Sequence, residues 1–199
     1  MGNRNVAILV EKGSKEIILL GQNVNAYHGL NKKNTEVSLA KLIIELEKIK
    51  GLERISYTTS HPKDMHADLI NLHGSSSKLN FYLHLPVQSG SNIILKAMNR
   101  RYTKKDYLNI VNKIRLKCPG IALSSDFIVG FPNETKKDFK ETLDLVKEVQ
   151  FAQAYSFKYS SRPGTKSSKI NEGNISLEEA NDRLFELQDI LNKQQKDFN

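Results

Sequence analysis

The chain has 199 residues, of which 39% are hydrophobic and 8% aromatic; this composition excludes an intrinsically disordered protein and fits one folded domain, alone or with a small appendage. A net charge of +8 favours a polyanionic partner such as nucleic acid, but a lysine-rich solvated surface explains it equally well. No apolar stretch approaches the roughly 18 residues of a membrane span, and the N-terminus lacks the apolar core of a secretory signal, so we expect a cytosolic protein.

Cysteine and histidine give no sign of a metal site. Cys118 is the only cysteine, so the chain alone cannot supply a disulfide framework or a cysteine metal cage. Its place beside Pro119, at the end of a helical pattern, is typical of a small buried hydrophobe. His61 and His84 lack the spacing of a metal-binding pair, and we expect both to be structural.

The first part of the chain predicts one strand and one polar loop. Residues 1–10 give no clear pattern, although Val6–Val10 can form the tail of a helix that Gly13 ends. Glu16–Leu20 is typical of a short buried strand, and it runs into the polar segment Gly21–Gly29, which has glycine at both ends.

Further helices and strands then alternate. Apolar residues at helical spacing predict a helix over 37–50 that Gly51 ends, followed by a strand over 54–59 and a shorter helix over 64–73. A third strand, 80–85, opens into the polar loop 86–91. The next helix begins near Thr103, which with Asp106 forms a capping-box pattern.

The last part repeats this arrangement twice. The segment from Ser124 to Thr135 predicts a buried strand that delivers a loop to a helix, and Thr135 with Asp138 again has the capping-box pattern. A fifth strand over 154–159 ends in the loop 160–165. Ser176 and Glu179 are the third capping-box pair and precede a helix with a polar far end.

Five strands alternating with helices predict an α/β fold with a parallel sheet and right-handed crossovers. The sequence has no GxGxxG after the first strand and no Walker loop, which argues against Rossmann and P-loop sites. We therefore expect a partial TIM-like barrel. We expect it to lack its first strand, because little chain precedes Glu16. The expected division is an irregular or truncated lead-in over 1–10, a partial barrel over 11–170 and a C-terminal helix over 171–199 that leads away from the barrel.

All five strand-end loops are polar and contain Gly or Pro. Any one of them can be an ordinary turn, but the carboxyl ends of parallel strands meet at one edge of a sheet. Together they predict a cup lined with amide, hydroxyl and carboxylate groups, suited to a polar cofactor. Ser89 lacks the GxSxG pattern of a hydrolase. Glu134, just before a helix N-cap, is either a helix-dipole carboxylate or a cofactor ligand.

Six segments in this order resemble the motifs of the radical S-adenosylmethionine methylthiotransferases: Leu19–Tyr27, Thr59–Pro62, His84–Ser91, Met98–Thr103, Asp126–Thr135 and Tyr159–Thr165. The resemblance runs from about Val10 to Asn199. Within that family the Gly21–Tyr27 loop is similar to the MiaB type, which places a 2-methylthio group on isopentenyl-modified adenosine next to tRNA anticodons. It is less similar to the type that acts on a ribosomal protein.

The resemblance implies a radical barrel that holds S-adenosylmethionine at its strand carboxyl ends, with [4Fe–4S] clusters as further family cofactors and tRNA as partner. The residues at the family's cofactor positions are Gly21, Gln22 and Asn23 near the methionine amino group, Gln88 and Ser89 near the ribose, Ile128, Gly130 and Glu134 in the fourth-strand motif, and Tyr159 and Arg162 at the last strand's rim. No residue of this chain is expected to be catalytic or to bind metal.

The departures from the family matter as much. Its members have an N-terminal domain with three cysteines, a Cys-x-x-x-Cys-x-x-Cys segment that opens the barrel, and a nucleic-acid-binding TRAM domain after the last helix. None of these occurs in the sequence, and Cys118 cannot replace the thiolates that a cluster needs. We therefore expect a fragment of a tRNA methylthiotransferase, from a truncated or split gene or excised from a longer chain, that is inactive alone.

Three alternatives remain open. The first is a non-catalytic module that binds tRNA or a separate cluster-bearing chain. The second is a methylthiotransferase for another tRNA base or for a ribosomal protein. The third is an unrelated α/β enzyme on a barrel, since fold alone does not fix function. An incomplete barrel also exposes a sheet edge, which predicts poor solubility or oligomerisation.

Overall fold

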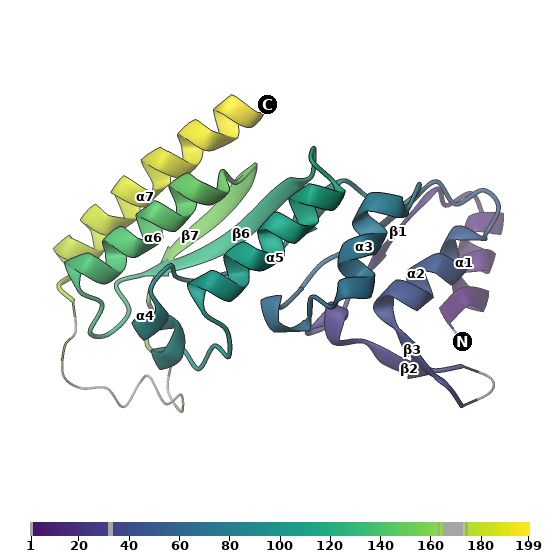
Figure 1. Ribbon diagram of the computed structural model, residues 1–199, viewed down its shortest axis with the longest axis horizontal. Coiled ribbons are helices and arrows are strands. Elements are labelled where there is room, and N and C mark those ends of the chain that lie inside the picture. Colours follow the sequence, from purple (N-terminus) through teal and green to yellow (C-terminus); the bar gives the residue numbers. More distant parts are fainter. Residues whose placement is uncertain (1, 32–33, 163, 165–172, 174) are drawn as a thin grey trace. The chain divides into compact units, whose positions relative to one another are not determined.

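The computed structural model describes residues 2–31, 34–162, 164, 173 and 175–199. The chain forms two compact units (Figure 1). Unit 1 comprises Met1–Leu85 and Asn112–Ile121, and unit 2 comprises Pro86–Val111 and Ala122–Asn199. Each unit has its own buried apolar residues and is described by itself.

Unit 1 is built around parallel strand pairing. Its elements are α1 (Gly2–Glu11), β1 (Glu16–Leu19), η1 (Val24–Ala26), β2 (His28–Leu30), β3 (Glu36–Ser38), α2 (Leu39–Glu47), β4 (Arg54–Tyr57), η2 (Pro62–Asp64), α3 (Ala67–Ser75) and β5 (Tyr82–His84). β1 runs parallel to β4, with Glu16 opposite Arg54 and Leu19 opposite Tyr57. A parallel bridge between Ile55 and Leu79 adds the segment before β5 on the other side of β4.

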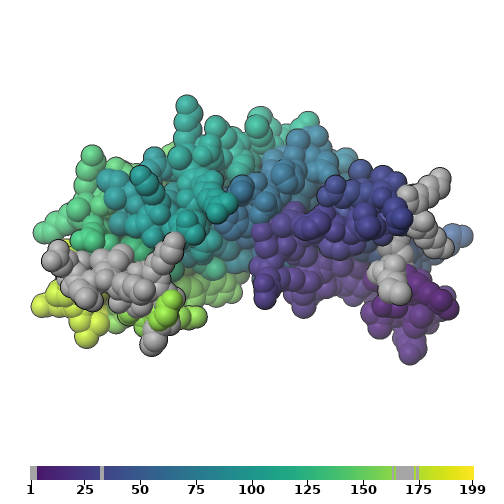
Figure 2. Space-filling view, turned by 90° about the horizontal axis from the view of Figure 1, so that it is seen from below, coloured from purple at the N-terminus to yellow at the C-terminus, as the bar shows by residue number. Residues whose placement is uncertain are grey.

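Two features of unit 1 differ from the expected elements. Residues 2–11 form helix α1, so the helical alternative for the lead-in is the right one. The segment after β1 contains an antiparallel hairpin, β2 with β3, that the sequence did not predict. Both strands have three residues, too few to show an alternating pattern. The hairpin belongs to the dark blue part of the surface in Figure 2, and Leu30 at its end is 71% exposed.

Helix α2 supplies much of the core of unit 1. Ile43 and Leu46 are almost fully buried, as are Ile55 on β4 and Leu69 on α3. Ser38 begins α2 as its N-cap, and its Oγ accepts a hydrogen bond from the backbone N–H of Lys41.

Unit 2 is a parallel sheet covered by helices. Its elements are α4 (Asn92–Ala97), α5 (Lys104–Lys117), of which the residues after Val111 belong to unit 1, β6 (Ala122–Val129), α6 (Lys136–Val149), β7 (Gln153–Lys158) and α7 (Leu177–Phe198). β6 runs parallel to β7, from Ser124 opposite Gln153 to Val129 opposite Lys158. α7 packs against β7 and against α6 (Figure 1).

The core of unit 2 lies between this sheet and its helices. Phe127 and Phe151 meet edge to face with ring centroids 5.5 Å apart, and both are buried. Gly90 allows a close backbone approach, because a Cβ at that position would lie 2.4 Å from the carbonyl oxygen of Glu141.

The predicted helix starts are largely confirmed. Thr135 and Asp138 form a reciprocal capping box at α6. At α5, the Oγ1 of Thr103 accepts from the backbone N–H of Asp106, whose carboxylate accepts from Thr103 in return. At α7, Ser176 accepts from the N–H of Glu179. Residues 171, 172 and 174 of the predicted C-terminal segment lie outside the described residues. Within the described part, no helix is long and apolar enough to span a membrane.

Candidate cofactor site

Unit 2 contains a pocket of about 780 Å³ beside the carboxyl ends of β6 and β7. Four of the residues predicted from the sequence line it: Gln88, Ile128, Tyr159 and Arg162. The other lining residues are Ala97, Met98, Asn99, Arg100, Asp126, Phe131, Phe157, Lys158 and Ser160. The pocket thus joins apolar and aromatic surface with amide, carboxylate and cationic groups, as sites for polar cofactors do.

The backbone fixes Gln88 from both sides. Its N–H donates to the carbonyl of Asp126 at 2.9 Å, and its own carbonyl accepts from the N–H of Ile128 at 2.9 Å, so residue 88 extends the β6–β7 sheet by one bridge. Its φ is +75°, a left-handed conformation that is rare for residues other than glycine. Such strain persists only where surrounding structure holds it, often at binding sites.

Tyr159 lines this pocket, and its buried hydroxyl has no partner in the described part of the chain. Its ring packs edge to face on Phe131 with centroids 4.9 Å apart, and its N–H donates to the carbonyl of Val129 at 2.8 Å. Its hydroxyl is buried and finds no hydrogen-bond partner among the described residues. Because buried hydroxyls are normally satisfied, a polar ligand group is a chemically suitable partner.

Ser89 lies beside this pocket but does not line it. Its Oγ is 3.3 Å from the hydroxyl of Thr142 and accepts from the N–H of Ser91 at 3.2 Å, and the residue is fully buried. Ser91 donates to Asp138 at 2.6 Å. Burial acts to raise the pKa of Asp138, but the hydrogen bonds from Ser91 and Thr135 prevail and hold it below its usual value. This buried network ties the segment after Gln88 to α6.

Gly130 and Glu134 form a second anchor in unit 2. The N–H of Gly130, at φ +71°, donates to Glu134 Oε2 at 2.8 Å. Arg183 on α7 donates to the same oxygen at 2.7 Å and to the Glu134 carbonyl at 2.9 Å. Its other nitrogen donates to Glu179 at 2.6 Å. Burial raises the pKa of Glu134, although Gly130 and Arg183 oppose this.

The Glu134 carboxylate thus forms a buried ion pair with Arg183 on α7. The two sequence-based interpretations of Glu134, a helix-dipole carboxylate or a cofactor ligand, did not include this ion pair. Its second oxygen, Oε1, is buried without a partner among the described residues. Neither Glu134 nor Gly130 lines the pocket, and their role towards the cofactor stays a prediction.

The predicted cofactor residues of the loop after β1 belong to unit 1: Gly21, Gln22 and Asn23. Side chains from the segment after β4 bind this loop. Thr59 donates through Oγ1 to the carbonyl of Gly21, and Asn23 donates through Nδ2 to Asp64 at 2.6 Å. Gln22 is exposed. The φ of Thr59 is +65°, a strained value for a β-branched residue.

Asn25 completes this connection and was missed as a site residue. Its Oδ1 accepts from the N–H of His61 at 2.8 Å, and its Nδ2 donates to the His61 carbonyl at 2.9 Å, so the amide pairs with the backbone as a neighbouring strand does. Asn25 is 4% exposed. His61 itself accepts from the N–H of Lys63 at the start of η2, which supports the structural role expected of it.

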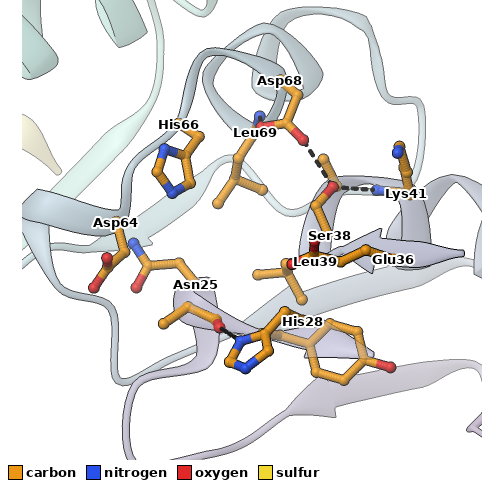
Figure 3. Close-up of a pocket in the computed structure, with 13 residues that line it drawn as sticks. Asn25, His28, Glu36, Ser38, Leu39, Lys41, Asp64, His66, Asp68 and Leu69 are labelled. Carbon is orange, nitrogen blue, oxygen red and sulfur yellow. Dashed lines mark hydrogen bonds between the residues drawn. The ribbon is translucent and has the colours of Figure 1, made fainter. Parts of the chain in front are cut away.

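A second pocket, of about 490 Å³, lies wholly in unit 1 between η1, β3, α2 and α3 (Figure 3). Ser38 donates to Asp68 at 2.7 Å on one wall, and His28 Nδ1 donates to the carbonyl of Ala26 at 2.8 Å on another. Within the described residues, no group of three His, Cys, Asp or Glu side chains is arranged to hold a metal ion. This pocket contains none of the predicted cofactor residues.

Comparison with known proteins decides the family. Residues 3–146 match the Radical SAM superfamily. The chain belongs to that superfamily.

It is 55% identical over 194 residues to the tRNA-2-methylthio-N(6)-dimethylallyladenosine synthase of Ruegeria sp. (strain TM1040), covering 98% of this chain and 43% of the relative. The synthase of Wolbachia pipientis subsp. Culex pipiens (strain wPip) is 55% identical over 197 residues, covering 98% and 44%. The resemblance to methylthiotransferases is thus confirmed, and the chain spans less than half of these relatives.

Solved structures show the same fold. The coproporphyrinogen III oxidase HemN of Escherichia coli, a radical SAM enzyme, superposes with a TM-score of 0.70 at 18% identity and covers 96% of this chain and 44% of that one. The cobalamin-dependent radical enzyme OxsB gives a TM-score of 0.55 at 17% identity, covering 96% and 26%. The expected α/β radical SAM fold is confirmed.

Superfamily membership implies S-adenosylmethionine and a [4Fe–4S] cluster, and the residues fit these two groups differently. The pocket in unit 2 fits a nucleoside-sized polar molecule, because apolar Ile128 and Phe157 line it together with Tyr159, whose hydroxyl has no partner among the described residues. A cluster does not fit, since the sequence has one cysteine and clusters of this kind need several thiolates. Cys118 is 4% exposed, and burial raises the pKa of its thiol.

Proposed function

We propose that this chain is part of a radical S-adenosylmethionine tRNA methylthiotransferase, the whole of which adds a 2-methylthio group to N6-isopentenyladenosine near the anticodon. The observation that carries the proposal is the 55% identity over 98% of the chain to a tRNA-2-methylthio-N(6)-dimethylallyladenosine synthase. Because the chain spans 43% of that relative, activity, substrate and partners are those of a longer assembly.

In this proposal the chain's own residues hold and orient the cofactor. S-adenosylmethionine, when bound, supplies the chemistry of radical sulfur insertion and methyl transfer. Ile128 and Phe157 offer apolar surface for its base, and Gln88 and the Tyr159 hydroxyl offer hydrogen bonds. The unit 1 loop with Gly21, Gln22 and Asn23, held by Thr59 and Asp64, is assigned to the methionine amino group through its motif.

The proposal includes no catalysis by this chain alone, because its side chains cannot hold the cluster. The thiolates have to come from the rest of a longer protein or from a separate cluster-bearing chain. The test is anaerobic treatment with iron and sulfide, followed by cluster absorbance and a 5′-deoxyadenosine assay. The full-length synthase of Ruegeria sp., treated in parallel, should form a cluster and turn over, whereas this chain should do neither. Cluster formation with turnover by this chain alone would overturn that part of the proposal.

A cytosolic tRNA-binding role also belongs to the proposal, supported by the net charge of +8 and by the relatives' names. Electrophoretic titration with unmodified tRNA at several salt concentrations tests it. Contacts with tRNA phosphates predict affinity that falls steeply as salt rises, because binding releases counterions. tRNA binding that does not change with salt, or no tRNA binding at low salt, contradicts this role. Neither result bears on cofactor binding by the unit 2 pocket.

A further inference from the structure

Arg100 is one of the cationic side chains that line the unit 2 pocket. Three cations, Arg100, Lys158 and Arg162, line this pocket against one acid, Asp126. Lys158 donates to Asn181 on α7 at 2.6 Å, and Arg162 also has an interaction of its own. Across the described residues, no hydrogen bond or ion pair engages the Arg100 guanidinium, although the residue is half-buried. A partly buried cation of this kind is stabilised by an anion.

The backbone around Arg100 is fixed on its N-terminal side by the end of α4. Asn99 adopts φ +59°, its N–H donates to the carbonyl of Lys96 at 3.0 Å, and the N–H of Arg100 donates to Leu95 at 2.8 Å. This is the Schellman arrangement, in which a left-handed residue ends a helix and two hydrogen bonds run back to it. The position of the Arg100 Cα is therefore set by the sequence Met98-Asn99-Arg100, a motif that the cofactor assignment had left without a role.

Tyr102 fixes the backbone on the other side. Its hydroxyl donates to the carbonyl of Val87 at 2.9 Å, one residue before Gln88. Burial raises the pKa of Tyr102 to about 12, with the nearby Arg100 charge acting in the opposite direction. Tyr102 is therefore neutral at pH 7 and does not supply a negative charge to Arg100. These two anchors hold the backbone of Arg100 in place, so less backbone freedom is lost when an anion binds.

We propose that Arg100 anchors the anionic group of the ligand in the unit 2 pocket. A guanidinium presents two parallel N–H groups that match a carboxylate or a phosphate. The inference rests on the proposed function, which offers two such anions: the carboxylate of the amino-acid part of S-adenosylmethionine and a phosphate of the RNA. Both sources use the same chemistry at Arg100, and the experiment separates them.

The test compares Arg100→Gln with Arg101→Gln, because Arg101 is the adjacent arginine, is exposed and does not line the pocket. Each variant is titrated with S-adenosylhomocysteine, which has the carboxylate, and with methylthioadenosine, which lacks it. A carboxylate anchor predicts that Arg100→Gln weakens S-adenosylhomocysteine binding by about 10- to 100-fold, as expected for a charged hydrogen-bonded pair, and leaves methylthioadenosine unchanged. Arg100→Lys, which keeps the charge without the paired donors, should fall between wild type and Arg100→Gln.

The second arm uses an anticodon stem-loop RNA. If Arg100 anchors a phosphate, Arg100→Gln should weaken RNA binding and leave S-adenosylhomocysteine binding unchanged. The slope of log affinity against log salt concentration should become shallower by about one. Thermal unfolding of each variant checks that the pocket is intact.

The inference is overturned if Arg100→Gln behaves like Arg101→Gln with all three ligands. It is also overturned if a folded Arg100→Gln loses methylthioadenosine as strongly as S-adenosylhomocysteine, because the residue would then not act through an anion. In both cases wild-type binding of these ligands leaves the proposed function standing. A wild-type chain that binds none of the three contradicts the proposed function and the inference together.

Discussion

The two units hold their strand-end loops in different ways. In unit 1, mostly neutral groups join one loop to the other: the amide of Asn25 pairs with the backbone of His61, and Thr59 donates to Gly21. Asn23 adds a hydrogen bond to the half-buried carboxylate of Asp64. In unit 2, buried carboxylates join loops to helices: Glu134 pairs with Arg183 on α7, and Asp138 accepts from Ser91. The connections of unit 1 through Asn25 and Thr59 span 36 to 38 positions of the chain, whereas the ion pair of unit 2 joins Glu134 to a residue 49 positions away.

Breaking the buried ion pair of unit 2 should have the largest effect. Arg183→Met leaves the Glu134 carboxylate buried without its cation, and we expect a loss of about 3–5 kcal/mol in the free energy of unfolding by urea. The side chains of Arg183 and Glu134 are 6% and 0% exposed, so water cannot replace the lost partner.

The matched control removes both charges. Glu134→Gln combined with Arg183→Met should recover part of the loss, because no unpaired charge remains buried. If the free energy of unfolding of the single Arg183→Met variant lies within about 0.5 kcal/mol of the wild-type value, the ion pair does not stabilise the unit 2 loop.

Removing the neutral connection of unit 1 should have a smaller effect. Asn25→Ala leaves the N–H and carbonyl of His61 without their partner, and we expect a loss of about 2 kcal/mol. Gln22→Ala in the same loop is the control, since Gln22 is exposed and should change stability by less than about 0.5 kcal/mol. Equal effects of the two substitutions would show that the Asn25 connection is not specific.

Acid should weaken unit 1 through His73. The hydroxyl of Tyr57 and Nε2 of His73 form a hydrogen bond of 2.6 Å, and burial lowers the pKa of His73 from 6.5 to about 4. Below pH 6.5 the unfolded chain binds a proton that the folded chain does not, so the free energy of unfolding falls as the pH drops from 6.5 towards 4. The slope from this one group is at most about 1.4 kcal/mol per pH unit, or about 2 kcal/mol by pH 5.

Urea unfolding at several pH values checks this dependence. His73→Gln, which does not titrate in that range, should lose this component of the slope even though it is less stable at pH 7. An unchanged slope in the variant would exclude His73 as its source.

Removing a helix N-cap should give the smallest difference in unfolding free energy between the two units. Ser38→Ala at α2 and Thr135→Ala at α6 should each cost about 1 kcal/mol in unfolding free energy. Each substitution also removes a hydrogen bond from the hydroxyl to a carboxylate, Asp68 for Ser38 and Asp138 for Thr135. Thr135→Ala should cost more, because Asp138 is buried whereas Asp68 is exposed. A larger loss for Ser38→Ala would contradict this ranking, and parallel thermal unfolding scans would show it.

The sequence was informative where structure is local. Apolar runs located the strands that became β1, β4, β5, β6 and β7, and the threonine and aspartate three residues apart located the start of α6. α4 and the β2–β3 hairpin were missed, because short elements show too little periodicity. For α1 the sequence indicated only a helix tail at Val6–Val10, whereas the helix spans Gly2–Glu11.

The site was predicted only in part. The motifs identified Gln88, Ile128, Tyr159 and Arg162, which the pocket brings together. They did not reveal the partner of Glu134, since Arg183 lies on a different helix and carries no local signal. They also did not reveal Arg100, whose exposure to the pocket depends on a left-handed residue at the end of α4.

Calorimetric titration with S-adenosylmethionine, without any cluster, tests most directly whether unit 2 keeps a cofactor pocket. We predict saturable binding to the wild-type chain that Tyr159→Phe weakens, because Tyr159 lines the pocket with an unpartnered hydroxyl. Tyr155→Phe, at a tyrosine on β7 that does not line the pocket, should bind as wild type does. No saturable binding to wild type, or equal binding by the Tyr159 and Tyr155 variants, would contradict the assignment of this pocket to the cofactor.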